Sequence, residues 1–319
     1  MSDVKDIPIS NDGENVHNKT KKIKKIFRYG NYNRYYGRRK VDSATSLDPR
    51  LTLFPKNFFK SKKILDIGCN VGAVTLGIAK NFEPQMILGI DIDSHLIGVA
   101  RKNIRHYCDK DIEIKGLYPA SFFQENGKLR EDLGHEDNIF SVNHFPNNVW
   151  FQHENYVLES DFHLEAVEQE YDVILALSIT KWIHMNFGDD GMKRFFKRIF
   201  LHLNLGGKLV LESQDFKSYY KKAKQDKELL KNYKEIKFKP EEFKEYLLSD
   251  EVGFIKHEEL GIPEGSGEGY GRMIEVFTKD TKFKSNRKRK IKENGGDNLN
   301  HEKKLPPSKV IKFNDSDED

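Results

Sequence analysis

The sequence is poor in cysteine and in long apolar runs, and each absence narrows the class of protein. With only two cysteines among 319 residues, Cys69 and Cys108, the chain can build neither a disulfide framework nor a cysteine-rich zinc site. No apolar stretch approaches the roughly 20 residues that span a bilayer. Residues 1–16 also lack the apolar core of a secretory signal. We therefore expect a protein of a reducing compartment, the nucleus or the cytoplasm, with no membrane partner.

Charge is abundant but almost balanced, and its distribution divides the chain. Lysine and arginine total 54 against 50 acidic residues, so the net charge of +4 argues only weakly for a nucleic-acid partner. Residues 1–25 end in a lysine cluster, and residues 281–319 hold a basic run at 284–292 before an acidic end. Neither tail has a periodic apolar face whose burial would offset its ordering entropy. We predict two disordered tails around one domain at residues 26–280, with a variable loop at 109–148. The basic run is typical of a nuclear import signal or an RNA contact, and equally of a solubilising tail.

Strand-like and helix-like segments alternate between the tails, which predicts an α/β fold with a largely parallel sheet. The expected elements are strands at 64–67, 86–93, 148–152, 171–177 and 208–212, and helices at about 71–80, at 94–107 and from Met192 to the Gly206-Gly207 pair. Two further apolar segments, at 252–260 and 273–278, predict a terminal antiparallel hairpin. This combination is the outline of the class I methyltransferases, whose fold is Rossmann-like.

A glycine-rich turn follows the first expected strand. Its Gly68-x-x-x-Gly72 spacing is shorter than the G-x-G-x-x-G of dinucleotide sites, so the usual pyrophosphate cradle is not encoded. Asp91 ends the second strand about twenty residues further on, where an acid accepts hydrogen bonds from ribose hydroxyls. The alternative is that Asp91 and Asp93 only cap the next helix. Because loop, acid and terminal hairpin occur together, we interpret the turn as a site for S-adenosylmethionine.

Two motifs that identify particular methyl acceptors are missing. The chain has no Asn/Asp-Pro-Pro-aromatic tetrapeptide, which serves methylation of adenine amines, and neither cysteine follows a proline, as the nucleophile of cytosine C5 enzymes does. These absences exclude two acceptors without identifying the true one.

Two other stretches point to an anionic acceptor. Residues 27–40 alternate aromatic and basic side chains, which can stack on bases and bind phosphates, with Arg34, Arg38 and Arg39 facing an anion. The alternative is an aromatic segment that packs over the core. Lys181 and His184 follow the central strand, at the edge of the sheet where ligands bind, although each alone is most often an ordinary loop residue.

Several runs together carry a family resemblance. They are YGNYNRYYGRR, LDIGCNVGAVTL, GIDID, ARKNIRHY, FPNNVWF, NYVL, YDVILALSITKWIHMNFGDDG and HLNLGGKLVLE. Over residues 26–280 the chain resembles the bicoid-interacting-protein family of RNA 5′-phosphate methyltransferases, the methylphosphate capping enzymes. The basic ending at residues 37–40 departs from the family pattern, so the resemblance does not define how the RNA 5′ end is bound.

The resemblance implies roles for individual residues. The cofactor-binding residues would be Tyr36, Arg50, Gly68, Cys69, Asn70, Asp91, Ile92, Asn155, Tyr156 and Leu177. The RNA-binding residues would be Arg34, Tyr35, Arg38, Arg39, Lys181 and Trp182. The catalytic residues would be Lys181, His184 and Arg38, with Lys181 and Arg38 holding the phosphate and His184 orienting it or tuning its protonation.

The function that the resemblance implies is methylation of the γ-phosphate of a small noncoding RNA such as 7SK or U6 small nuclear RNA, with S-adenosylmethionine as methyl donor. No metal is required, because an ionised terminal phosphate is already a nucleophile. The partners would be the RNA 5′ end and proteins of a ribonucleoprotein particle. Two alternatives remain open: methylation of an RNA 5′-monophosphate, and an RNA-binding scaffold that stays on its RNA and stabilises it.

Overall fold

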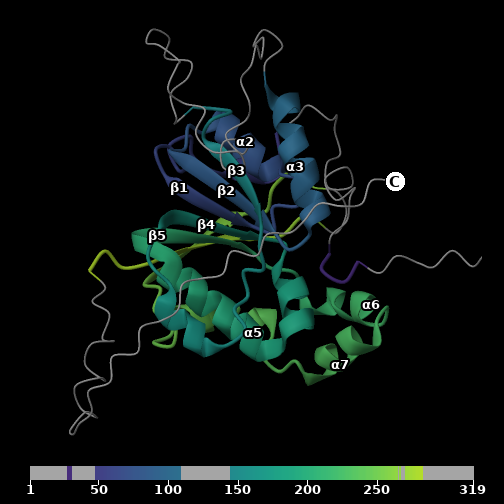
Figure 1. Cartoon of the computed structure of the whole chain (residues 1–319). Coiled ribbons are helices and arrows are strands. Elements are labelled where there is room, and N and C mark those ends of the chain that lie inside the picture. Colours follow the sequence, from purple (N-terminus) through teal and green to yellow (C-terminus); the bar gives the residue numbers. More distant parts are fainter. Residues whose placement is uncertain (1–26, 31–46, 109–143, 265, 267–269, 283–319) are drawn as a thin grey trace, which may run out of the picture. The chain divides into compact units, whose positions relative to one another are not determined.

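A parallel sheet with helices on both faces forms the centre of the domain (Figure 1). The computed structural model describes residues 27–30, 47–108, 144–264, 266 and 270–282. Residues 1–25 and 283–319 of the predicted tails, and residues 109–143 of the predicted loop, lie outside this part of the chain. Among the helices that are described, none combines the length and the hydropathy that a bilayer span requires.

Within the described residues, seven strands form one sheet in the order β3-β2-β1-β4-β5-β7-β6. The strands are β1 Lys63–Ile67, β2 Met86–Asp91, β3 Val149–His153, β4 Tyr171–Leu177, β5 Leu203–Glu212, β6 Lys256–Gly261 and β7 Ile274–Thr278. Strands β1 to β5 pair in parallel, whereas β7 runs antiparallel to both of its neighbours, β5 and β6. The predicted parallel sheet and terminal hairpin are confirmed.

The two faces of the sheet are covered by different helices (Figure 1). Helices α2 (Ala73–Asn81) and α3 (Ser94–Tyr107) contribute to one apolar core, and α5 (Thr180–His202) and α8 (Phe243–Leu248) contribute to the other. Strand β4 lies between the two cores, which explains why its sequence is an almost continuous apolar run instead of an alternating one.

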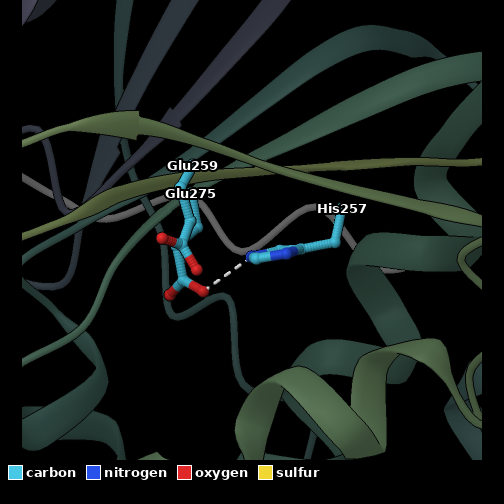
Figure 2. A group of neighbouring side chains, drawn as sticks. All are labelled: His257, Glu259 and Glu275. Atoms are coloured by element: carbon cyan, nitrogen blue, oxygen red, sulfur yellow. Dashed lines mark hydrogen bonds and ion pairs between the residues drawn. The ribbon is translucent and has the colours of Figure 1, made fainter.

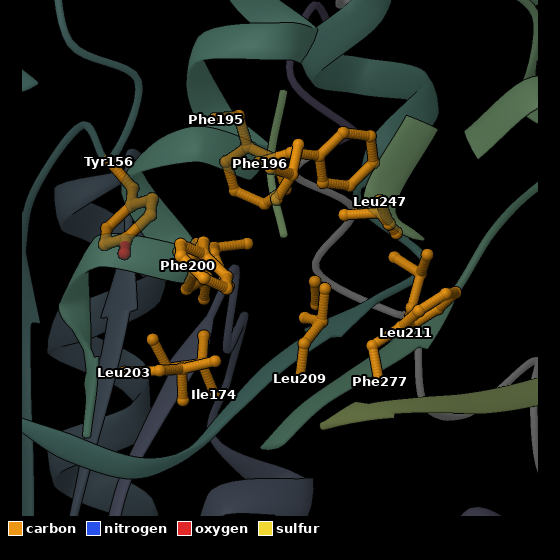
Figure 3. Packing of buried hydrophobic residues seen from close by; sticks show 14 of the residues in the cluster. Tyr156, Ile174, Phe195, Phe196, Phe200, Leu203, Leu209, Leu211, Leu247 and Phe277 are labelled. Carbon is orange, nitrogen blue, oxygen red and sulfur yellow. The ribbon is translucent and has the colours of Figure 1, made fainter. Parts of the chain in front are cut away.

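Aromatic side chains fill the core beneath α5 (Figure 3). Phe195, Phe196 and Phe200 are each no more than 3% exposed and share one cluster with Leu209 and Leu211 of β5. Burial of such side chains contributes about 1.5–3 kcal/mol each relative to leaving them in water. This core holds α5 against the sheet, and the first turns of α5 carry several of the predicted site residues.

The boundaries of α5 differ from the sequence prediction at both ends. The helix starts at Thr180, so Lys181 and His184 are helical residues and not loop residues. It ends at His202, and the Gly206-Gly207 pair lies inside β5. The pair therefore does not close the helix. The strand pairing shifts register in this region, and Gly206 has φ 74°, a backbone conformation that suits glycine.

Residues 213–251 form a helical segment between β5 and β6 that the sequence analysis does not assign. Its elements before α8 are η4 Phe216–Ser218, α6 Tyr220–Ala223, α7 Lys227–Glu235 and η5 Pro240–Glu242; the other short helices are η1 Pro49–Leu53 and η3 Asp161–Ala166. Tyr219 and Leu229 of the segment pack against Met185 of α5 in a separate apolar cluster. The segment thereby covers one side of the first turns of α5.

Candidate active site

A cavity opens at the carboxyl ends of β1, β2 and β4, the edge at which open α/β sheets bind ligands. The predicted site residues in its wall are Arg50, Gly68, Asn70, Asp91, Ile92, Asn155, Tyr156, Leu177 and Trp182. The wall also contains residues that the sequence analysis missed, among them Tyr29, Gly30, Asp66, Glu154, Ser178 and Ile179. Asp66 could have been found, because it is an acid near the end of β1, as Asp91 is at the end of β2.

The turn after β1 is held close to its neighbours by its glycines. The backbone N–H groups of Gly68 and Cys69 both donate to the carbonyl of Ile90, at 2.8 and 3.0 Å. Gly68 has φ 73°, and a Cβ there would overlap the side chain of Ile179. Gly72 has φ 80°, and a Cβ there would lie 2.6 Å from the ring of Phe151. The glycine spacing therefore follows from the backbone conformation and from the close approach of α5 and β3.

Asp91 and Asp93 differ in position, because Asp91 lines the cavity whereas Asp93 caps the next helix. The Asp91 carboxylate accepts hydrogen bonds from the backbone N–H groups of Asn70 and Asp93, both at 2.9 Å, and lines the cavity. Burial raises its pKa. The Asp93 carboxylate instead accepts from the N–H groups of His95 and Leu96 and caps α3.

Asp66 is a second buried carboxylate of the cavity. Its Oδ2 accepts a hydrogen bond of 2.6 Å from the Thr75 hydroxyl, and burial raises its pKa to about 6. Arg50 opposes this rise of the pKa, and Asp91 adds to it. The carboxylates of Asp66 and Asp91 therefore interact electrostatically within the cavity wall.

Replacing Asp66 with asparagine should change how folding stability depends on pH. Between the ordinary aspartate pKa near 4 and about 6, the unfolded chain has lost a proton that the folded chain keeps. Stability from this group is therefore lost as pH rises through that window. Asparagine does not titrate, and its oxygen can still accept from Thr75. Urea unfolding should show the stability of D66N rising by about 2 kcal/mol relative to the parent between pH 4 and 7. All other titrating groups occur in both proteins, so parallel pH profiles would contradict the prediction.

Arg50 reaches the cavity as part of a buried polar network. Its guanidinium pairs with Asp48 at 2.9 Å and with Glu212, at the end of β5, at 3.1 Å. The Ser178 hydroxyl donates to the same Glu212 oxygen at 2.6 Å, and Ser178 has φ 60°. This network links η1 to the ends of β4 and β5, so it fixes the wall of the cavity beside Asp66.

Lys181 lies next to the cavity wall, within a group of cations. Its ammonium donates to the Ser218 hydroxyl at 3.1 Å and lies 5.4 Å from the ring centroid of Trp182, which lines the cavity. Burial, together with the charges of Arg272 and Lys222, lowers the pKa of Lys181 to about 8. Arg272 itself donates to the Ser178 hydroxyl at 3.1 Å. Arg272 and Lys222 were not predicted; they come from the segments that precede β7 and β6.

His184 does not face the cavity, contrary to the sequence prediction. Its ring is fully buried between the rings of Tyr219 and Phe243, and its Nε2 bonds to Asp189 at 2.9 Å. Burial lowers its pKa. The reason is helical geometry, because Ile179, Trp182 and Ile183 turn toward the cavity whereas His184, one residue further on, is rotated by about 100°. His184 positions α5 against the 213–251 segment.

The side chain of Cys69, a predicted cofactor-binding residue, does not line the cavity. Its thiol is 1% exposed within the core formed by α2 and α3, and burial raises its pKa well above the ordinary value. Only the backbone of Cys69 belongs to the turn that borders the cavity.

The start of the basic aromatic segment lies at the cavity. Tyr29 and Gly30 line it, and a Cβ on Gly30 would overlap the indole of Trp182. Arg28 donates to the Asn186 side chain at 2.8 Å and pairs with Glu228 at 2.7 Å. The predicted residues further along, Arg34, Tyr35, Tyr36, Arg38 and Arg39, lie outside the described part of the chain, and their roles stay predictions.

The strand order and the position of the cavity are those of the class I methyltransferase fold. The comparisons with known proteins agree: a methyltransferase-domain family model matches residues 65–209, and the model of Bicoid-interacting protein 3 (Bin3) matches residues 171–279. The chain belongs to the Bin3 family.

Three relatives show the extent of the similarity. The 7SK snRNA methylphosphate capping enzyme of Homo sapiens is 40% identical over 281 residues, which cover 81% of this chain and 40% of that protein. The U6 snRNA methylphosphate capping enzyme Amus of Drosophila melanogaster is 40% identical over 255 residues, covering 79% of this chain and 75% of that one. A probable RNA methyltransferase of Arabidopsis thaliana is 34% identical over 275 residues, which cover 81% of this chain and 83% of that protein. The chain thus spans less than half of the human relative.

Proposed function

We propose that this chain transfers a methyl group from S-adenosylmethionine to the γ-phosphate at the 5′ end of a small noncoding RNA. The observation that carries the proposal is the proximity of two unlike surfaces. A cavity with Asp91 in its wall adjoins a group of cations that includes Lys181 and Arg272. The first suits a nucleoside cofactor, and the second suits a phosphate acceptor. The names of the relatives, which are methylphosphate capping enzymes of 7SK and U6 snRNA, support the same acceptor.

The residues of the cavity fit the cofactor. Asp91 would accept hydrogen bonds from the ribose hydroxyls, since its carboxylate is held in place by two backbone N–H groups. Ile92 and Leu177 supply apolar wall, and Asn155 supplies an amide for the base. The absence of a side chain at Gly68 leaves room for close approach to the backbone. When bound, S-adenosylmethionine supplies a methyl group on a sulfonium, which is activated for displacement.

The cations beside the cavity would hold the acceptor. A terminal phosphate has its second pKa near 6 and is largely dianionic at neutral pH. Charge-assisted hydrogen bonds from Lys181 and Arg272 would fix it and keep an oxygen directed toward the cavity. Phosphate binding would in turn favour the charged form of Lys181, whose pKa is lowered in its absence. Ser218, which already contacts the lysine ammonium, would position it.

The transfer then depends on alignment and needs no general base. Lys181 and Arg272 would hold a phosphate oxygen toward the methyl group. Displacement would form an oxygen–carbon bond while the sulfur–carbon bond breaks and its electron pair stays on sulfur, which would give a methylphosphate ester and S-adenosylhomocysteine. Orientation of two reactants can supply about 7–11 kcal/mol of such a barrier. The buried position of His184 agrees with this chemistry, because no proton has to be removed from the nucleophile.

A single assay tests the proposal. RNAs of identical sequence with a 5′-triphosphate or a 5′-monophosphate are incubated with the chain and methyl-labelled cofactor. We expect label on the triphosphate RNA, released as a small product by an enzyme that cuts between the α- and β-phosphates. Label only on the monophosphate RNA would favour the alternative acceptor. Binding of RNA without label on either would contradict the enzyme and favour the scaffold. We place the activity in the nucleus, because the relatives are named for small nuclear RNAs.

A further inference from the structure

The terminal hairpin presents three metal-ligating side chains on one face. His257 and Glu259 lie two residues apart on β6, so they point to the same side of the strand. Glu275 on β7 pairs directly with Glu259 in the antiparallel register. Figure 2 shows the three side chains converging below the strands. One ligand atom from each lies within 4.8 Å of the other two, and His257 Nε2 is 2.8 Å from Glu275 Oε1.

We propose that His257, Glu259 and Glu275 bind a Zn²⁺ ion, with solvent as the fourth ligand. One imidazole nitrogen and two carboxylates form a donor set that Zn²⁺ accepts in a tetrahedral site. The histidine distinguishes this group from the acid clusters that attract Ca²⁺ or Mg²⁺, which prefer oxygen ligands alone.

The burial of two of the ligands favours such a site. Two of the three ligands are largely covered, because the side chain of His257 is 9% exposed and that of Glu275 is 20% exposed. The His257 ring also packs on Phe277, with 4.7 Å between the ring centroids. Its Nε2 is therefore directed at Glu275 before any ion arrives. Zn²⁺ holds its nitrogen and oxygen ligands at about 2.0–2.2 Å, so the first two ligands need little movement.

Glu259 is the ligand that has to move. Its side chain is half exposed and forms a 3.6 Å ion pair with Lys244 of α8, whose side chain is equally exposed. An exposed pair of this kind contributes at most about 1 kcal/mol. Breaking the ion pair between Glu259 and Lys244 so that Glu259 can bind a divalent ion therefore costs little free energy. The ion would clamp the edge strand β6 to β7, a few residues from Arg272, so the site is structural and lies outside the proposed reaction.

The test uses the full chain, stripped with a chelator and titrated with ZnCl₂ in a calorimeter. We expect one equivalent of Zn²⁺ and a rise of the melting temperature on loading. The variants His257→Ala and Glu259→Gln should each weaken this binding by at least about tenfold and abolish the zinc-dependent rise. Glu259→Gln keeps the test valid if loss of the packed imidazole unfolds the hairpin, because its side chain is half exposed.

Glu258→Gln is the matched control. Glu258 lies between the two β6 ligands, points to the other side of the strand and pairs with Lys256 at 3.0 Å. Its substitution should leave zinc affinity within about twofold of the parent. Equal zinc binding by the parent, His257→Ala and Glu259→Gln would overturn the proposal, since the ion would then bind elsewhere, for instance at tail histidines such as His17 and His301. Absence of micromolar zinc binding by the parent would overturn it as well.

Discussion

Replacement of Lys181 with alanine should lower kcat/KM for methylation of 5′-triphosphate RNA by about two orders of magnitude, while S-adenosylhomocysteine binds as before. A hydrogen bond to a charged group contributes about 1.5–3 kcal/mol, and the lost interaction is with the acceptor alone. We expect methyl transfer to fall without loss of cofactor binding, because Lys181 lies beside the cavity and does not line it. Methyl transfer is measured with labelled cofactor, and cofactor affinity is measured by calorimetry.

Lys197→Ala is the control on the same helix. Lys197 carries the same charge but pairs with Glu251 at 3.6 Å, and we expect its substitution to leave both quantities within about twofold. Unchanged methylation kinetics in K181A would contradict the assignment of Lys181. Loss of cofactor binding in K181A would show instead that the substitution disturbs the fold of α5.

The pH dependence of RNA binding gives a second readout for Lys181. Its pKa near 8 means that the free protein loses this ammonium charge as the pH rises through about 8. The contribution of Lys181 to RNA affinity is therefore present below that pH. Above that pH this contribution is lost. Bound phosphate raises the pKa of Lys181, so in the complex the loss begins at a higher pH. The affinity of the parent for 5′-phosphorylated RNA should fall faster between pH 7 and 9.5 than that of K181A. A purely structural role would not produce this difference.

Replacement of Asp91 with alanine should raise the dissociation constant of S-adenosylhomocysteine by at least about 100-fold. Two ribose hydroxyls would lose a charged acceptor, and each such hydrogen bond contributes about 1.5–3 kcal/mol. The substitution also removes the acceptor of the Asn70 N–H, so the turn after β1 loses one of its supports. Calorimetry measures the affinity, and urea unfolding of the same variant measures stability.

Asp93→Ala separates ribose binding from helix capping. Asp93 caps α3, so its loss should cost about 1 kcal/mol of stability and leave cofactor affinity within about threefold. Equal loss of affinity in both variants would favour the interpretation in which the two acids only organise the helix. Parent-like affinity in D91A would contradict the proposed ribose contact.

Features that depend on neighbouring residues in the chain were predictable. The turn between Gly68 and Gly72 and the Asp93 cap of α3 are local, and their residue types suit the observed conformations. The strand β4 was recognisable because a run buried on both faces is apolar throughout. The class I fold followed from the order of these elements together with the terminal hairpin.

Features that depend on distant contacts were not predictable from pattern. Lys181 was found from its place after β4, but the cations around it come from elsewhere in the chain. Lys222 lies in the segment after β5, and Arg272 precedes β7. Arg50 was expected to contact the cofactor, whereas its pairing with Glu212, 162 residues away, requires the folded sheet. The orientation of His184 depends on where α5 begins, and a shift in that boundary rotates each side chain by about 100° per residue.

By itself, the sequence predicted the class I methyltransferase fold and placed Gly68 and Asp91 at the ends of the first two strands, where the cavity lies. These conclusions rest on local backbone geometry and on periodic burial, which adjacent residues encode. Only the tertiary structure decided that Asp66 lines this cavity, that Arg272 lies beside it on Ser178, and that His184 is turned away from it. Contacts between residues far apart in the chain form only when the sheet and its helices pack. Their partners therefore cannot be identified from spacing along the sequence.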